Sequence, residues 1–173
     1  MTPLGHASMS YLLGRVATRL PMRALVLGGI SPDFDSLLLA GGHFNDLHRV
    51  VTHNLAFVLV IGLVGAALAR DRRGWAGLAT GLGALIHILV DAVMDNNPSN
   101  GIGVALYWPF SAAMVSPFNL LATDCPGWTS FRAQIVCMIG DLVWEVPFWL
   151  GAAWLLARRR LFRRPAVAAH SAP

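Results

Sequence analysis

Three long apolar stretches constrain the fold of this chain more than any other feature. They cover residues 54–69, 75–93 and 131–157. With the first extended back to about Val50, each can supply the ~20 residues that a helix needs to cross a bilayer core. Only 13% of the residues are charged, whereas a soluble domain averages about 25%. The sequence therefore predicts an all-α integral membrane protein with three full transmembrane helices.

The segment before these stretches predicts a shorter element. Residues 8–20 are typical of an amphipathic helix, whereas residues 24–30 are apolar but too short to cross a bilayer alone. Pro21 lies between the two and breaks the helix. We therefore expect residues 4–40 to form a shorter N-terminal helical hairpin that packs against the three spans.

The arginines give this arrangement an orientation. All 13 basic residues are arginines, and 11 of them lie within residues 15–23, 70–73 and 158–164. If the chain alternates between the two sides of a membrane, these segments share one side, which the positive-inside rule makes cytoplasmic. Arginines at the cytoplasmic face of a bilayer thus account for the net charge of +4 and the pI of about 10.0. No aromatic-interleaved basic face or zinc-finger spacing indicates a nucleic-acid partner.

Five ionisable residues lie at one expected depth in or beside the apolar stretches. His87 and Asp91 are one helical turn apart and share a face, as do Asp141 and Glu145, while His53 directly precedes the first stretch. Counted from the arginines at 1.5 Å per residue, all five lie roughly 20–27 Å from the cytoplasmic side. Ionisable groups at membrane depth normally face a cavity and pair with one another or with a ligand.

More histidines and aspartates lie close to this layer in the sequence. His48 and His53 belong to "HRVVTH", Asp33 and Asp35 to "SPDFD", and His6 to "LGHASM". Imidazole nitrogens and carboxylate oxygens are ligands of zinc, manganese and non-haem iron, and the number of histidines favours zinc over manganese. These residues are more than the four ligands that one tetrahedral ion needs. Their number therefore favours two ions that share a bridging carboxylate. Such a centre activates water and stabilises an oxyanion, as phosphoester hydrolysis requires.

Four motifs in a fixed order resemble a known family. "PDFD", "HRVVTH" before a long apolar helix, "HILVDAV" and "YWPFS" resemble the YdjM-like family of bacterial inner-membrane proteins, which are described as membrane-bound metal-dependent hydrolases. The resemblance runs from His6 to about Ser111. It implies a bacterial inner-membrane location, and it implies metal-ligand roles for His6, Asp33, His48, His53, His87 and Asp91, with Asp35 as an alternative ligand or a support for one.

The sequence is also similar, more remotely, to the zinc-dependent phospholipase C and nuclease superfamily. His87 and Asp91 form an H-x-x-x-D pair that looks like one of the ligand pairs of those enzymes. Asp141 and Glu145 stand where they use H-x-x-x-E, with Asp in place of His. The resemblance therefore implies that Asp141 is a further ligand, while the substitution argues against a third metal.

Together these features predict a di-metal hydrolase site near the outer leaflet, on the periplasmic side. A lipid or lipid-linked phosphoester is the expected substrate because the site lies at headgroup depth. Asp33, Asp35 and Glu145 are the candidates for the general base or the last ligand. Arg49 is a candidate for binding the substrate phosphate, although it could instead neutralise Asp46 or Asp35.

The same features predict one membrane-embedded hydrolase-like domain over residues 1–162. Residues 163–173 are expected to form a disordered cytoplasmic tail. The connection over residues 95–130 is rich in Pro, Asn and Gly, and long ordered loops usually bind a ligand or cover a site. The oligomeric state is left open.

Two other functions use the same residues. A proton- or ion-coupled transporter would use His87, Asp91, Asp141 and Glu145 as a relay, but it would need ionisable groups through the whole depth of the bilayer. A non-catalytic membrane adaptor would use the cluster as a structural metal site. Structural zinc sites commonly have four protein ligands, often cysteines, and neither cysteine here lies in a motif with a histidine.

Overall fold

The computed structural model describes residues 1–16, 19–35, 47–94, 103–118 and 131–161, with the backbone alone for 131–138, 141 and 160–161. Its regular secondary structure consists of five helices and one isolated bridge between Val104 and Val115. The helices are α1 (Pro3–Val16), α2 (Met22–Ile30), α4 (Leu55–Leu68), α5 (Arg73–Met94) and α6 (Phe131–Leu161). The described part of the chain therefore confirms the prediction of an all-α fold.

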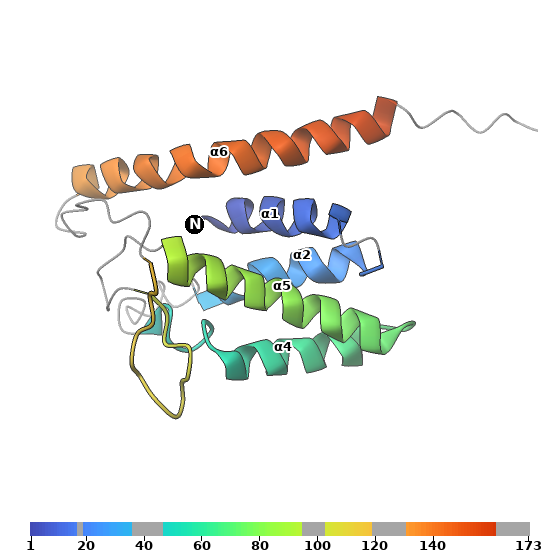
Figure 1. Ribbon diagram of the computed structural model, residues 1–173, viewed down its shortest axis with the longest axis horizontal. Coiled ribbons are helices and arrows are strands. Elements are labelled where there is room, and N and C mark those ends of the chain that lie inside the picture. Colours follow the sequence, from blue (N-terminus) through green and yellow to red (C-terminus); the bar gives the residue numbers. More distant parts are fainter. Residues whose placement is uncertain (17–18, 36–46, 95–102, 119–130, 162–173) are drawn as a thin grey trace, which may run out of the picture.

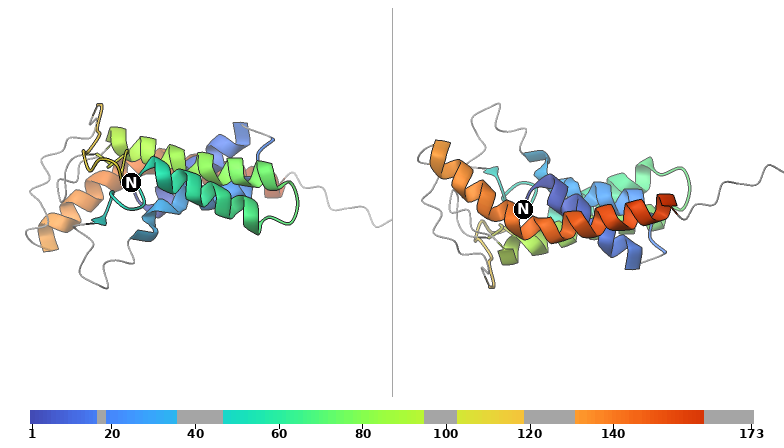
Figure 2. Two further views of the ribbon diagram at one scale, coloured as in Figure 1. Left: turned by 90° about the horizontal axis from the view of Figure 1, so that it is seen from below. Right: turned by 90° about the horizontal axis from the view of Figure 1, so that it is seen from above.

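The helices lie side by side along a common direction, with α5 in a central position (Figures 1 and 2). α5 packs against both α2 and α4, α1 packs against α2, and α6 packs mainly against α1. α1 therefore separates α6 from α5. α1 and α2 form the expected hairpin, and Pro21 is the N-cap of α2, where its lack of an amide hydrogen is tolerated.

Small residues allow α2 to approach α5 closely. A Cβ atom added to Gly28 would meet the backbone of Thr80, and one added to Gly83 would meet the backbone of Leu25 and Gly29. Because glycine has no side chain, the two backbones come into direct contact. This is the usual way in which helices pack in lipid, where apolar burial gives little driving force.

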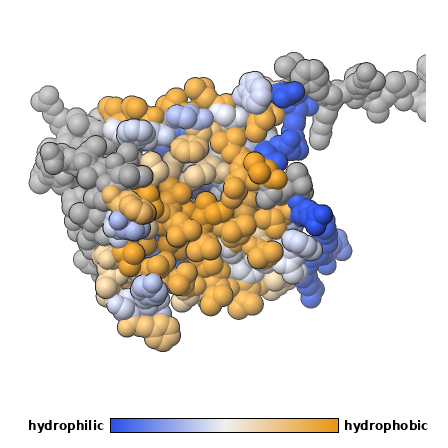
Figure 3. Space-filling model, viewed as in Figure 1, coloured by the Kyte–Doolittle hydropathy of each residue, from blue (hydrophilic) through white to orange (hydrophobic). Residues whose placement is uncertain are grey.

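The outer surface of the helices suits a bilayer better than water. None of the 14 residues of α4 is buried, although the helix is almost entirely apolar. Figure 3 shows a broad hydrophobic area over the side of the molecule and hydrophilic residues gathered at one end. Such an extensive exposed apolar surface marks contact with a membrane or a partner.

One helix, α5, is long and apolar enough to cross a membrane among the described residues. α4 is shorter, with 14 residues, and reaches only about 21 Å at 1.5 Å per residue. The prediction of three full spans therefore stays a prediction. The expected tail over residues 163–173 lies outside the described residues, as does part of the connection over residues 95–130.

The arginine-rich segments meet at one end of the bundle. The C-terminal end of α1, the start of α2, the α4–α5 connection and the C-terminal end of α6 all lie at this end (Figure 1). These segments contain residues 15, 23, 70–73 and 158–160, which are arginines except for Asp71. The opposite end, where the N-terminus lies, contains the histidine and aspartate residues described next.

Candidate metal centre

Five predicted metal ligands meet at the end of the bundle opposite the arginines. His6 comes from the first turns of α1, and His87 and Asp91 come from successive turns of α5. Asp33 follows α2, and His53 directly precedes the N-cap of α4. The three histidines and Asp91 are almost completely inaccessible to solvent, with exposed fractions of 4% or less.

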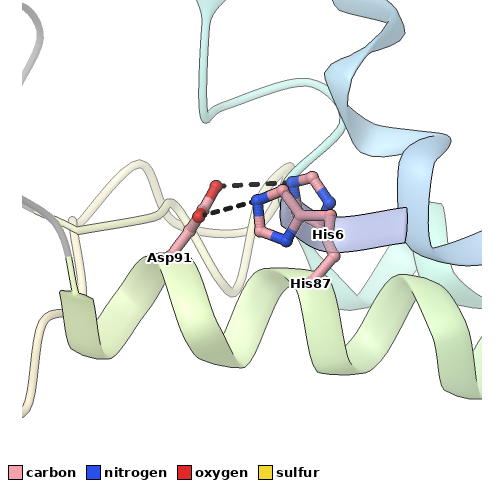
Figure 4. Close-up of side chains that lie close together, drawn as sticks. All are labelled: His6, His87 and Asp91. Atoms are coloured by element: carbon pink, nitrogen blue, oxygen red, sulfur yellow. Dashed lines mark ion pairs between the residues drawn. The ribbon is translucent and has the colours of Figure 1, made fainter. Parts of the chain in front are cut away.

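The first group joins α1 to α5 (Figure 4). His6 Nε2 lies 3.1 Å from Asp91 Oδ1, and His87 Nε2 lies 3.3 Å from Asp91 Oδ2. The two imidazole rings are stacked, with their centroids 3.5 Å apart. His87 and Asp91 point to the same place because they are four residues apart on one helix. The N-terminal amine of Met1 also lies 3.3 Å from Asp91 Oδ1.

The second group shares His87 with the first. His53 Nε2 lies 3.2 Å from His87 Nε2, and Asp33 Oδ1 lies 3.5 Å from that same nitrogen. His53 Nε2 is also 3.4 Å from Asp91 Oδ2. Asp91 thus directs one oxygen to His6 and the other to His53 and His87, as a bridging carboxylate would.

Hydrogen bonds on the far side of two rings fix which nitrogen faces the cluster. His87 Nδ1 lies 2.7 Å from the carbonyl oxygen of Gly29, which can only accept, so Nδ1 donates. His53 Nδ1 lies 3.0 Å from Thr52 Oγ1, whose own proton goes to Asp35. In the neutral rings, both Nε2 atoms then carry lone pairs and face each other, an arrangement that needs a positive charge between them.

The cluster attracts such a charge. Burial alone would lower the pKa of His53, but Asp35 and Asp91 outweigh burial and raise it. His6 Nδ1 and Asp33 Oδ2 are buried without a hydrogen-bond partner among the described residues. Ligand atoms of His6, His87 and Asp91, and those of Asp33, His53 and His87, lie within 4.8 Å of one another. The described residues therefore contain two buried His/Asp groups that could hold a metal ion.

Asp35 organises the histidines from behind. Its Oδ2 atom is 3.0 Å from His48 Nδ1 and 3.3 Å from His53 Nδ1, and it also accepts bonds from Thr52 Oγ1 and the Arg49 amide. Burial alone would raise the pKa of Asp35, but the hydrogen bonds from His48 and His53 hold it well below its usual range. Carboxylates in this position fix the orientation of metal-binding histidines.

Asp33 differs from Asp35 in its surroundings. Burial raises the pKa of Asp33 to about 6, and its Oδ2 atom has no hydrogen-bond partner among the described residues. A carboxyl group of this kind takes up and releases a proton near neutral pH. The two aspartates of "PDFD" therefore have different chemical properties although they are two residues apart.

Part of the long connection over residues 95–130 packs beside the cluster. Within residues 103–118, the carbonyl oxygen of Leu106 accepts a bond from the Leu55 amide, and the Ala105 amide donates to the carbonyl oxygen of Arg49. Val104 and Ala105 have no exposed surface. This segment therefore fixes the start of α4, and with it the position of the "HRVVTH" motif.

Four predicted site residues with described side chains, Asp35, His48, Arg49 and Glu145, are not in either His/Asp group. His48 lies behind the cluster with Asp35, and the buried Arg49 lies close enough to His48 to lower its pKa, although burial is the larger cause of that shift. Glu145 has no exposed surface, but its carboxylate accepts bonds from the amide and hydroxyl of Thr2. The side chain of Asp141 lies outside the described residues.

The position of Glu145 has a simple geometric reason. Glu145 lies at the cluster end of the bundle, since its partner Thr2 is only four residues before His6. However, α1 packs between α6 and α5, so Glu145 faces the start of α1. A Cβ atom added to Gly5 of α1 would meet the Glu145 carboxylate, which shows how closely the two helices approach there.

Two contributors to the site were not predicted from the sequence. Thr52 contacts both Asp35 and His53 through its hydroxyl, and its place beside His53 in "HRVVTH" was the available signal. Gly29 contributes its carbonyl oxygen to His87. No local pattern marks a backbone acceptor 58 residues away from the histidine that it orients.

The fold and the site together define a class: a helical membrane protein with a buried His/Asp cluster at one end of its bundle. The comparison with family models identifies the family, because residues 1–169 match the model described as YdjM inner membrane protein. The chain therefore belongs to the YdjM inner membrane protein family, as the order of its motifs predicted, and associates with the lipid bilayer. No curated protein and no solved structure matches it significantly.

Proposed function

We propose that this protein is a membrane-bound, metal-dependent hydrolase with two divalent ions, most consistent with zinc, at the His/Asp cluster. One observation carries the proposal: His53 and His87 direct their Nε2 atoms at each other across 3.2 Å while an oxygen atom contacts each Nδ1. Two imidazole nitrogens together with carboxylate oxygens form a ligand set that is typical of zinc. Divalent ions in a site of this kind act as Lewis acids and activate water.

The proposed ligands divide into two sets that share Asp91. His6 and Asp91 Oδ1 form one set, and His53, His87, Asp33 and Asp91 Oδ2 form the other. His87 belongs to the second set because its Nδ1 atom bonds Gly29, which leaves one nitrogen for an ion. We propose that His48 is a further ligand through its other ring nitrogen. Asp141, at the expected depth on α6, stays a candidate.

The remaining residues would act on protons and on the substrate. Asp33 is a better candidate for the general base than Asp35. Burial raises the pKa of Asp33 to about 6, which is near the pH at which a general base must work. Asp35 is a positioning residue for His48 and His53, since its low pKa makes it a weak base. Arg49, next to Asp35 and His48, is the candidate for binding a phosphate. Glu145, which we predicted as catalytic, would instead support α1.

The position of the cluster supports a lipid or lipid-linked phosphoester as the substrate. If the arginine-rich end is cytoplasmic, the His/Asp cluster lies on the periplasmic side, at the depth of the outer headgroups. With this orientation, we propose one domain over residues 1–162, three membrane spans and a cytoplasmic C-terminal tail. A transporter remains the main alternative, and metal content separates the two.

The metal content of protein purified in detergent without chelators tests this proposal. We expect about two equivalents of zinc or manganese in the wild type, none in Asp91→Asn, because the two sets share this carboxylate, and about one in His87→Ala or His6→Ala. Asp71→Asn, an exposed acid at the arginine-rich end, is the matched control and should keep both ions. A wild type without metal would overturn the proposal and favour a proton-relay transporter. Hydrolysis of a chromogenic phosphodiester, lost in parallel with the metal, would support catalysis.

A further inference from the structure

A second candidate site is a groove of about 1060 Å³ between α2 and α4, which extends along α2 from the arginine-rich end of the molecule. Both helices pack against α5 but have little contact with each other, so α5 forms the floor of the groove. Six residues illustrate its construction, two each from α2, α4 and α5: Ala24, Leu27, Ile61, Val64, Ala76 and Thr80. The walls are apolar, and the small floor residues leave the groove hollow.

Arginines surround the end of this groove. Arg19, Arg23, Arg70 and Arg72 line it together with one acid, Asp71. All five residues are exposed, so the groove combines an apolar interior with a positively charged mouth. A ligand that fits both parts carries a hydrocarbon chain and an anionic head.

The length of the groove fits one leaflet of a bilayer. Its lining extends along α2 from Arg23 to Ser31, which is about 12 Å at 1.5 Å per residue. Half of a hydrocarbon core is about 15 Å thick. The side chains of Leu27 and Val64 are 59% and 40% exposed, so the groove is open along its side to the surrounding lipid.

We propose that this groove binds one anionic phospholipid of the cytoplasmic leaflet. One acyl chain lies between α2 and α4, and the phosphate contacts the arginines at the mouth. Charge complementarity selects an anionic head, because a zwitterionic head brings a cation next to four arginines. This inference goes beyond the proposed hydrolase, since the arginine mouth and the His/Asp cluster lie at opposite ends of the bundle.

Native mass spectrometry of the detergent-solubilised protein tests the apolar part of the site. We expect one retained phosphatidylglycerol per chain. Val64→Trp should reduce retention at least tenfold, because the indole fills the groove, and Leu27→Trp should do the same from the opposite wall. Leu63→Trp is the matched control, since Leu63 is the exposed neighbour of Val64 and does not line the groove. Retention that is unchanged in both groove variants would overturn the proposal.

The charged part has its own test. The double variant Arg23→Gln/Arg70→Gln should weaken phosphatidylglycerol binding at least about tenfold. Arg73→Gln, which changes an exposed arginine outside the groove, should leave it unchanged. Equal binding of phosphatidylcholine would contradict the selection of an anionic head, and full competition by chain-free glycerol phosphate would contradict a site for an acyl chain. A dimer in place of bound lipid would show that a second copy occupies the groove. The metal content of each variant keeps this result separate from the hydrolase proposal.

Discussion

His53 and His87, 34 residues apart in the sequence, direct their Nε2 atoms at each other at 3.2 Å. Neither ring is free to turn away, because Gly29 engages Nδ1 of His87 and Asp35 engages Nδ1 of His53. The backbone and the carboxylate therefore preorganise the two nitrogens before any ion binds. Interactions of this kind orient the ligands of a metal site and thereby tune its affinity.

Loss of the Asp35 carboxylate should weaken metal binding without removing a direct ligand. In Asp35→Asn, a neutral amide replaces the carboxylate. Its hydrogen bonds with His48 and His53 are weaker, so both rings can turn. We expect the metal affinity to fall about 10- to 100-fold, as measured by competition with a chelator of known affinity. Asp71→Asn controls for the change in net charge. An affinity equal to that of the wild type would refute the positioning role of Asp35.

Close packing of α2 and α5 should make Gly83 intolerant of even one methyl group. A Cβ atom at residue 83 meets the backbone of α2 and cannot be accommodated by a side-chain rotation. We expect Gly83→Ala to destabilise the protein by about 1–3 kcal/mol and to lower its melting temperature in detergent. Gly74→Ala places the same atom in open space near the start of the same helix, so its melting temperature should stay near that of the wild type.

Removal of the Glu145 carboxylate should affect stability more than metal content. Glu145→Ala leaves the amide and hydroxyl of Thr2 without their acceptor, which we expect to reduce the free energy of unfolding by about 1–3 kcal/mol. Glu145→Gln retains one acceptor oxygen and should lose less. Thermal unfolding measures the stability of both variants, and elemental analysis measures their metal content. Loss of metal in Glu145→Gln would show that Glu145 contributes to the metal site.

Some parts of this arrangement follow from the sequence and others depend on tertiary packing. The i, i+4 spacing of His87 and Asp91 fixes their common direction on any helix, so this pair could be predicted. Pro21 and the apolar stretches likewise predicted the hairpin and the positions of the helices. Spacing along α6 predicts a depth for Glu145, but it does not reveal which helix Glu145 faces. The insertion of α1 between α6 and α5 decides that point.

The metal-free protein should show a pH dependence that comes from Asp33. Burial raises the pKa of this carboxyl from 3.8 to about 6, so folding favours its protonated form. The folded state is therefore not penalised below pH ~4 and loses stability as the pH rises through about 6. A shift of this size corresponds to roughly 2–3 kcal/mol.

Asp33→Asn removes the ionisation, so it should raise the melting temperature of chelator-treated protein at pH 8. At pH 4.5 the folded carboxyl is largely protonated and most of the penalty is absent, so the difference in melting temperature should be much smaller. With metal present the order should reverse at pH 8, because the wild type gains binding energy that the amide variant lacks. A stabilisation of equal size at both pH values would contradict the elevated pKa, since a neutral carboxyl and an amide would then differ for a reason unrelated to charge.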